Sequence, residues 1–119
     1  MSESLPQGTN SVVHGHGAIV PLEPVPVDEV DSGSPRQGIL ELGPIGGCNT
    51  GIWELREGAV FDTEVDEIFV VLSGGAVIEL LDEGRTVEVN AGDVMRLVAG
   101  TRTRWIVEDH IRKVYIAGA

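Results

Sequence analysis

The segment GAVFDTEVDEIFVVLSGG, residues 58 to 75, places several acidic side chains directly before a hydrophobic run and a glycine turn. Its acids are Asp62, Glu64, Asp66 and Glu67, and it contains no histidine. Carboxylates at this spacing can offer oxygen ligands to a hard cation, or one of them can act as a general acid or base. The alternative is that they only face water, because charged side chains are seldom buried unless they are paired.

Strand geometry separates these acids into two groups. Successive side chains of an extended strand point to opposite faces, so Asp62, Glu64 and Asp66 would share a face. We expect these three to face solvent. Glu67 is the acid that we expect to turn toward the interior.

The remaining residues with reactive or metal-binding side chains are three histidines and one cysteine. His14 and His16 lie on one side of an extended segment, a spacing that a metal could use, but we expect them to belong to a solvated tail. His110, in the polar stretch VEDHIRK, is expected to be a surface histidine. Cys48 has no second cysteine for an intrachain disulfide, and we expect it to be a small residue in a turn rather than a catalytic thiolate.

Length and charge narrow the classes of function. A chain of 119 residues suits one domain, and 42% hydrophobic residues are enough to build a core. Eight basic against 19 acidic residues give a net charge of −11, which argues against nucleic acid or an anionic membrane as a partner. No apolar run is long enough to span a bilayer, and the opening MSESLPQGTN has no signal pattern, so we expect a cytoplasmic protein.

The chain pattern predicts an all-β fold. Residues 1–11 are polar and lack periodicity, which predicts a flexible lead. Residues 12–37 carry four prolines and therefore allow only edge strands or an extended arm. From Gly38 onward, runs rich in Val, Ile and Leu alternate with glycine-bearing turns, as in EIFVVLSGG and AVIELLDEG. Many short strands at even spacing predict a sandwich or a small barrel.

Two segments resemble the signature motifs of the cupin superfamily. Glu67 is followed by six residues and then Gly74, which matches the end of the first motif. Gly92 and Gly100 match the glycine spacing of the second motif.

Longer segments of the sequence resemble one branch of that superfamily. The segments GIWELREGAVFDTEVDEIFVVLSG, AGDVMRLVAGTRTRW and RKVYI are similar to the short cupins grouped with the ureidoglycine aminohydrolase and ethanolamine-utilisation type. The resemblance implies a single jelly-roll barrel, a double-stranded β-helix, over residues 38–119. It also implies a homodimer. The flexible lead and the extended arm predicted from composition together make up residues 1–37.

The resemblance locates the positions at which metal-binding cupins carry their ligands. These positions fall on Phe61, Thr63, Glu67 and Thr103, so only one conventional ligand of the four is present. A transition metal prefers imidazole, thiolate or several well-placed carboxylates. We therefore expect no metal and no cofactor.

The same template places a set of side chains inside the barrel. Glu67 would be an acid in an apolar cup, which makes it the candidate catalytic acid or base. Alternatively, it forms a buried ion pair with Arg96 or Lys113 that holds the barrel closed. The expected ligand pocket consists of Trp53, Phe61, Thr63, Phe69, Arg96, Thr103, Trp105 and Tyr115, and the alternative for its aromatic residues is plain core packing.

Three functions are compatible with this reading. The first is a metal-independent cupin that binds a small polar, nitrogenous metabolite, with Glu67 as the acid or base if a reaction occurs. The second is a non-catalytic ligand sensor or structural cupin, in which Glu67 is only part of an ion pair. The third is a metal-dependent enzyme similar to the aminohydrolase, against which the missing histidines count.

Overall fold

The computed structural model describes residues 3–118, and it is almost entirely β-structure. Because short β-branched runs alternate with glycine turns, the chain forms strands joined by tight connections. The all-β class predicted from the sequence is confirmed. The elements are β1 (Glu23–Pro24), the 3₁₀ turn η1 (Val27–Glu29), β2 (Val30–Ser32), β3 (Arg36–Ile45), β4 (Cys48–Thr63), β5 (Glu67–Leu80), β6 (Arg85–Asn90), β7 (Val94–Leu97) and β8 (Arg102–Ala117).

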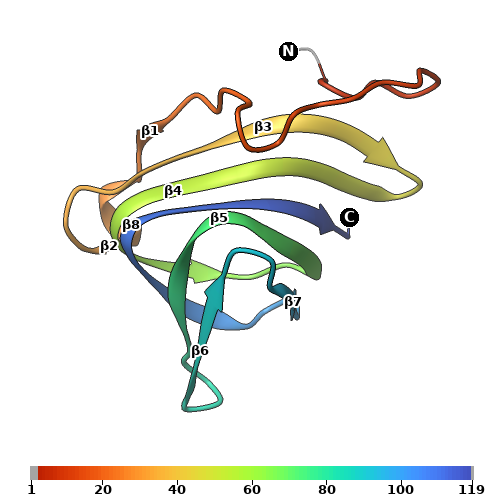
Figure 1. Ribbon diagram of the computed structural model, residues 1–119. Coiled ribbons are helices and arrows are strands. Elements are labelled where there is room, and N and C mark those ends of the chain that lie inside the picture. The colour runs from red at the N-terminus through yellow and green to blue at the C-terminus, as the bar shows by residue number, and fades with distance from the viewer. Residues whose placement is uncertain (1–2, 119) are drawn as a thin grey trace.

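The strands form one antiparallel sheet that curls around an interior (Figure 1). The main order is β1-β3-β4-β8-β5-β6, while β2 pairs with β4 and β7 pairs with β5. Three long strands, β4, β5 and β8, pass through the whole barrel. Each pairs over nearly its full length, so residues far apart in sequence line the same interior.

Register shifts allow the long strands to bend. The β4–β8 ladder shifts between Arg56 and Gly58, and the β5–β8 ladder shifts between Val71 and Ser73 and again after Gly74. An extra residue in one strand of a pair bends that strand and increases its twist. Gly74 has φ +70, a conformation that other residues rarely adopt, and a Cβ atom there would overlap the carbonyl oxygen of His110.

The main core fills the barrel. Its buried members include Leu55, Phe69, Ile78, Trp105 and Ile111, each 2% exposed or less. These residues come from β4, β5 and β8, and they alternate with more exposed positions along each strand, as a half-buried sheet requires. The barrel core therefore fixes the orientation of the side chains on the inner faces of these three strands.

A smaller core lies under the N-terminal segment. Val20, Leu42 and Ile52 are buried there, and Leu5 and Val13 pack against them. The backbone N–H of Leu5 donates to the carbonyl oxygen of Leu42 at 2.7 Å. The segment before β1 runs along β3 in Figure 1.

The arm is also held by a side chain of β8. The guanidinium of Arg112 donates to the carbonyl oxygens of Gly15 at 2.8 Å and Ala18 at 2.6 Å. The same guanidinium forms an ion pair with Glu54 at 2.7 Å. The N-terminal arm thus covers part of the sheet, and β3 begins at Arg36, two residues before the expected domain boundary. Within residues 3–118, no helix has the length and apolar character that a membrane span needs.

Candidate functional site

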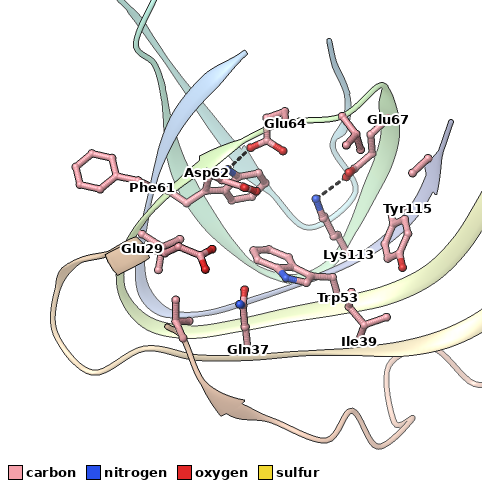
Figure 2. Close-up of a pocket in the computed structure, with 15 residues that line it drawn as sticks. Glu29, Gln37, Ile39, Trp53, Phe61, Asp62, Glu64, Glu67, Lys113 and Tyr115 are labelled. Atoms are coloured by element: carbon pink, nitrogen blue, oxygen red, sulfur yellow. Dashed lines mark hydrogen bonds and ion pairs between the residues drawn. The ribbon is translucent and has the colours of Figure 1, made fainter. Parts of the chain in front are cut away.

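A cavity of about 320 Å³ opens into the barrel. Its walls come from η1, from β3 and β4, from the start of β5, and from β8 (Figure 2). This volume lies within the usual range for small-molecule sites. The cavity is therefore the candidate functional site.

A buried ion pair lies in the cavity wall. Lys113 Nζ on β8 is 2.5 Å from Oε2 of Glu67, the first residue of β5. The two side chains are 6% and 8% exposed. The sequence left Arg96 and Lys113 open as partners for Glu67, and the structure selects Lys113. Arg96 is exposed on β7, where it pairs in register with Ile68.

Three aromatic rings surround the Lys113 ammonium group. Its Nζ lies 4.8 Å from the ring centroid of Trp53, 4.3 Å from that of Phe69 and 4.8 Å from that of Trp105. Trp53 and Trp105 meet edge to face at 5.3 Å. An ammonium ion is attracted to the negative face of each ring. The rings and the carboxylate of Glu67 together stabilise a positive charge that would otherwise be costly to bury.

Glu64 is buried, which corrects the expectation that it faces water. It is 6% exposed, and its Oε2 accepts hydrogen bonds from Thr103 Oγ1 at 2.6 Å and from Trp105 Nε1 at 2.9 Å. The parity argument fails because β4 ends at Thr63. Instead, the backbone of Glu64 is hydrogen-bonded to the loop before β8. Its N–H donates to the carbonyl oxygen of Thr101, and its carbonyl oxygen accepts from the N–H of Gly100. The side chain is thereby turned inward.

Asp62 and Asp66 are both exposed, as expected, but only Asp62 lies at the cavity. Asp62 contributes to the cavity wall, and its pKa is raised to about 6, first by desolvation and then by the nearby charge of Glu64. Asp66 is exposed, and its Oδ1 accepts a hydrogen bond from the N–H of Ala99 at 2.9 Å. Asp66 thus holds the loop around Ala99 through this hydrogen bond, whereas Asp62 lies in the cavity wall.

The structure brings together five of the nine residues predicted for the site. The cavity is lined by Trp53, Phe61, Glu67, Trp105 and Tyr115. Phe61 is 40% exposed, and Figure 2 shows its ring directed away from the centre of the cavity.

The other four predicted residues lie outside the cavity lining. Phe69 and Thr103 are fully buried behind the wall, where they contact Lys113 and Glu64, respectively. Thr63 and Arg96 are exposed. Template positions alone could not distinguish a residue that lines a cavity from one that lies behind it.

Several lining residues were missed by sequence reasoning. Glu29 on η1 and Gln37 and Ile39 on β3 contribute to the wall (Figure 2). Their segment precedes or only begins the recognisable motifs, so no spacing pointed to them. Their placement depends on β3 pairing with β4, which sets Ile39 opposite Trp53.

The residues present do not suit a metal ion. Of the family's ligand positions, only Glu67 carries a conventional ligand, and an ammonium group already occupies one of its oxygens. A metal cation there would be repelled by the Lys113 charge. Across residues 3–118, no group of three or more His, Cys, Asp or Glu side chains is arranged to hold a metal. A soft or borderline metal would find neither imidazole nor thiolate.

The curled antiparallel sheet with its interior cavity defines the class of protein as a small cupin barrel. Residues 42–115 match the family model described as the EutQ-like cupin domain, so the chain belongs to that family. The resemblance to the ethanolamine-utilisation branch is confirmed by this match.

A curated relative and several solved structures are similar to the chain. "Acetate kinase EutQ" of Clostridioides difficile (strain 630) is 29% identical over 98 residues, which cover 75% of this chain. The chain spans only 59% of that relative's length.

The solved structures support the fold. The structure of the Clostridium difficile EutQ protein matches with TM-score 0.61 and 23% identity, covering 81% of this chain and 79% of that chain. A protein of unknown function from Pseudomonas syringae pv. tomato matches with TM-score 0.70 and 20% identity, covering 84% of this chain and 44% of that one. The predicted cupin barrel is confirmed by these matches, which at such identities show the fold alone.

Proposed function

We propose that this cupin domain binds a small, positively charged, nitrogenous molecule in the barrel cavity without a metal ion. The observation that carries the proposal is the charge of the cavity wall. Four carboxylates, those of Glu29, Asp62, Glu64 and Glu67, face one ammonium group, that of Lys113. Because Lys113 is already paired with Glu67, the remaining carboxylates leave an excess of negative charge.

The outer half of the cavity is where such a ligand would fit. Figure 2 shows the carboxylates of Glu29 and Asp62 directed into the space beside Trp53. A ligand cation between these two carboxylates would relieve the desolvation and repulsion that raise the pKa of Asp62. Trp53 would supply an apolar wall and an aromatic surface that favours cations.

A neutral hydroxyl completes the polar lining. Burial, followed by the charges of Glu41 and Glu67, raises the pKa of Tyr115 above its ordinary value. Its phenol therefore stays protonated at neutral pH and can donate or accept a hydrogen bond. A ligand with a hydroxyl or carbonyl group next to its ammonium group would use both parts of the site.

A second candidate function is catalysis at the same site. Glu67 lines the cavity beside Lys113, so the pair could pass a proton to or from a bound ligand. In a non-catalytic structural cupin, the alternative that the sequence also allows, the same pair would only hold β5 and β8 together. The homodimer and the cytoplasmic location stay predictions.

The cavity wall is poorly suited to the phosphoryl transfer that the name of the Clostridioides difficile relative implies. Phosphoryl transfer depends on cationic groups and metal ions that neutralise phosphate charge. The cavity offers a single ammonium group, which is already paired.

A thermal-shift panel tests the proposal, since a ligand that binds the folded state raises the apparent stability. The probes are choline, tetramethylammonium, the neutral carbon isostere of choline, and acetate. We expect the two cations to raise Tm and the other two to leave it unchanged. Asp62→Asn should weaken the shift, whereas Asp82→Asn, which removes an equal charge at an exposed ion pair with Arg102, should not. Equal shifts with the isostere, or shifts with acetate alone, would contradict the proposal.

A further inference from the structure

A second cleft of about 300 Å³ lies on another part of the barrel, where it is lined by residues of β5, β6 and β8. Asp109 and His110 line this cleft, and Ser73 directly precedes its lining residue Gly74. The side chains of these three residues, Ser73, His110 and Asp109, form a chain of hydrogen bonds. Ser73 Oγ is 3.0 Å from His110 Nε2, and His110 Nδ1 is 2.5 Å from Asp109 Oδ2. None of the three lines the barrel cavity.

The backbone irregularities of the barrel bring these residues together. Adjacent side chains of a regular strand point to opposite faces, so Asp109 and His110 would normally be kept apart. Here the β4–β8 ladder passes from Arg56↔His110 directly to Gly58↔Val107, which leaves Asp109 in an irregular stretch where this alternation breaks down.

Gly74 provides the other half of the arrangement. The absence of a side chain at Gly74 lets β5 approach the backbone of His110 more closely than any other residue would allow. Ser73 directly precedes this contact, and its hydroxyl therefore reaches the imidazole. The glycine and the irregular stretch of β8 together determine the geometry.

The order of atoms is that of a nucleophilic triad. Asp109 accepts the Nδ1 proton of His110, which leaves Nε2 with a lone pair directed at the Ser73 hydroxyl. From this geometry we infer that Ser73 is a nucleophile toward activated acyl and phosphonyl groups, with His110 as its general base and Asp109 as the positioning residue. Unlike the buried acids of efficient hydrolases, Asp109 has a side chain that is 84% exposed, so slow rather than rapid turnover is expected.

The reaction uses only water as a co-reactant. Ser73 Oγ forms a bond to the carbonyl carbon of an ester while His110 Nε2 takes the hydroxyl proton. The ester C–O bond then breaks, and the departing alcohol receives the proton from His110. Water attacks the acyl-Ser73, its proton passes through His110, and the acid leaves as the serine hydroxyl is restored. The net change is hydrolysis of one ester bond, with no change in oxidation state.

The cleft indicates which esters would fit. Ala76, Val77 and Ile106 give it an apolar wall for a short acyl group. Glu88 and Glu108 place negative charge at the same cleft. Uncharged or cationic esters are therefore favoured, and anionic esters are repelled.

Intact-protein mass spectrometry after exposure to an uncharged fluorophosphonate tests the inference directly. In this reagent the P–F bond breaks, the P–Oγ bond forms, and fluoride leaves. We expect a single adduct on the wild-type protein, no adduct on Ser73→Ala, and at least a tenfold slower reaction of His110→Ala. Ser32→Ala, at an exposed serine of β2, is the control and should react at the wild-type rate.

A second comparison isolates the role of Asp109. Asp109→Asn should slow labelling severalfold, and Asp109→Glu should restore most of the rate, because the glutamate again accepts the Nδ1 proton. Circular dichroism establishes that each variant is folded. The inference is overturned if the wild type gives no adduct, if Ser73→Ala is labelled equally, or if His110→Ala reacts at the wild-type rate. Ligand binding in the barrel cavity is measured separately, so either proposal can fail without the other.

Discussion

The ammonium group of Lys113 and the carboxylate of Glu67 lie 2.5 Å apart, and both side chains are more than nine-tenths buried. The pair joins the start of β5 to the inner face of β8. Removing one partner would leave the other charge buried without compensation, which is more costly than removing both.

Glu67→Gln is expected to lower the free energy of unfolding by about 3 kcal/mol or more, because it leaves the Lys113 charge unpaired. The double variant Glu67→Gln with Lys113→Met should recover most of that loss. Urea denaturation measures both values. Glu83→Gln, at an exposed pair with Arg85, serves as the control and should have little effect. If Glu67→Gln lowers the free energy of unfolding only slightly, the pair does not stabilise the barrel.

Glu64 is expected to stabilise the fold through its hydrogen bonds rather than through its charge. Glu64→Ala would leave the Trp105 indole N–H without its acceptor and the Thr103 hydroxyl with only a long contact to the carbonyl oxygen of Asp62, at a cost of roughly 2 to 4 kcal/mol. Glu64→Gln keeps a carbonyl oxygen in place and should cost much less. Chemical denaturation, followed by tryptophan fluorescence, distinguishes the two variants. Equal losses in both would contradict this account.

Asp62 gives the stability a pH dependence. Its pKa is 3.8 in the unfolded reference and about 6 in the folded protein, so between these values the folded state binds more protons. The contribution of Asp62 to stability therefore falls as the pH rises from about 4 to about 6. Asp62→Asn should stabilise the protein at pH 7 relative to pH 4, by on the order of 1 kcal/mol after allowance for solvent screening. If the difference in unfolding free energy between the wild type and Asp62→Asn does not change with pH, the raised pKa of Asp62 is contradicted.

Arg112 is expected to hold the N-terminal arm on the sheet. Arg112→Met removes its hydrogen bonds to the carbonyl oxygens of Gly15 and Ala18 and leaves Glu54 with only its contact to Arg56. Hydrogen exchange of residues 12–20 should become faster, while exchange in the barrel core should change little. Arg85→Met, at an exposed pair far from the arm in sequence, is the control. Unchanged protection of the arm would show that apolar packing alone retains it.

The fold could be predicted because turn residues and strand patterns are local signals. Glycines marked the turns at Gly84, Gly92 and Gly100. The turn expected at Gly74 and Gly75 was wrong, because these residues lie inside β5, where the strand bends instead of ending. The inward direction of Glu67 followed from its spacing to Gly74, and Trp53, Trp105 and Tyr115 were correctly expected near it.

The rest of the site could not be predicted, because it depends on where the regular strands end and where their pairing shifts. Glu64 is buried because β4 stops one residue earlier, a boundary that periodicity does not fix. The choice between Arg96 and Lys113 depended on which face of its strand each residue occupies. Similarly, the contact between Ser73 and His110 depends on register shifts, and pattern reasoning assumes a regular ladder.

Isothermal titration of the wild-type protein at pH 7 with choline and with its neutral carbon isostere tests the central claim most directly. The account predicts binding of one choline per chain, at least tenfold weaker binding of the isostere, and weaker choline binding to Asp62→Asn. Choline affinity should also fall below pH 6 as Asp62 becomes protonated. Equal affinity for both probes, or an affinity for choline that Asp62→Asn leaves unchanged, would contradict a cation-binding cavity.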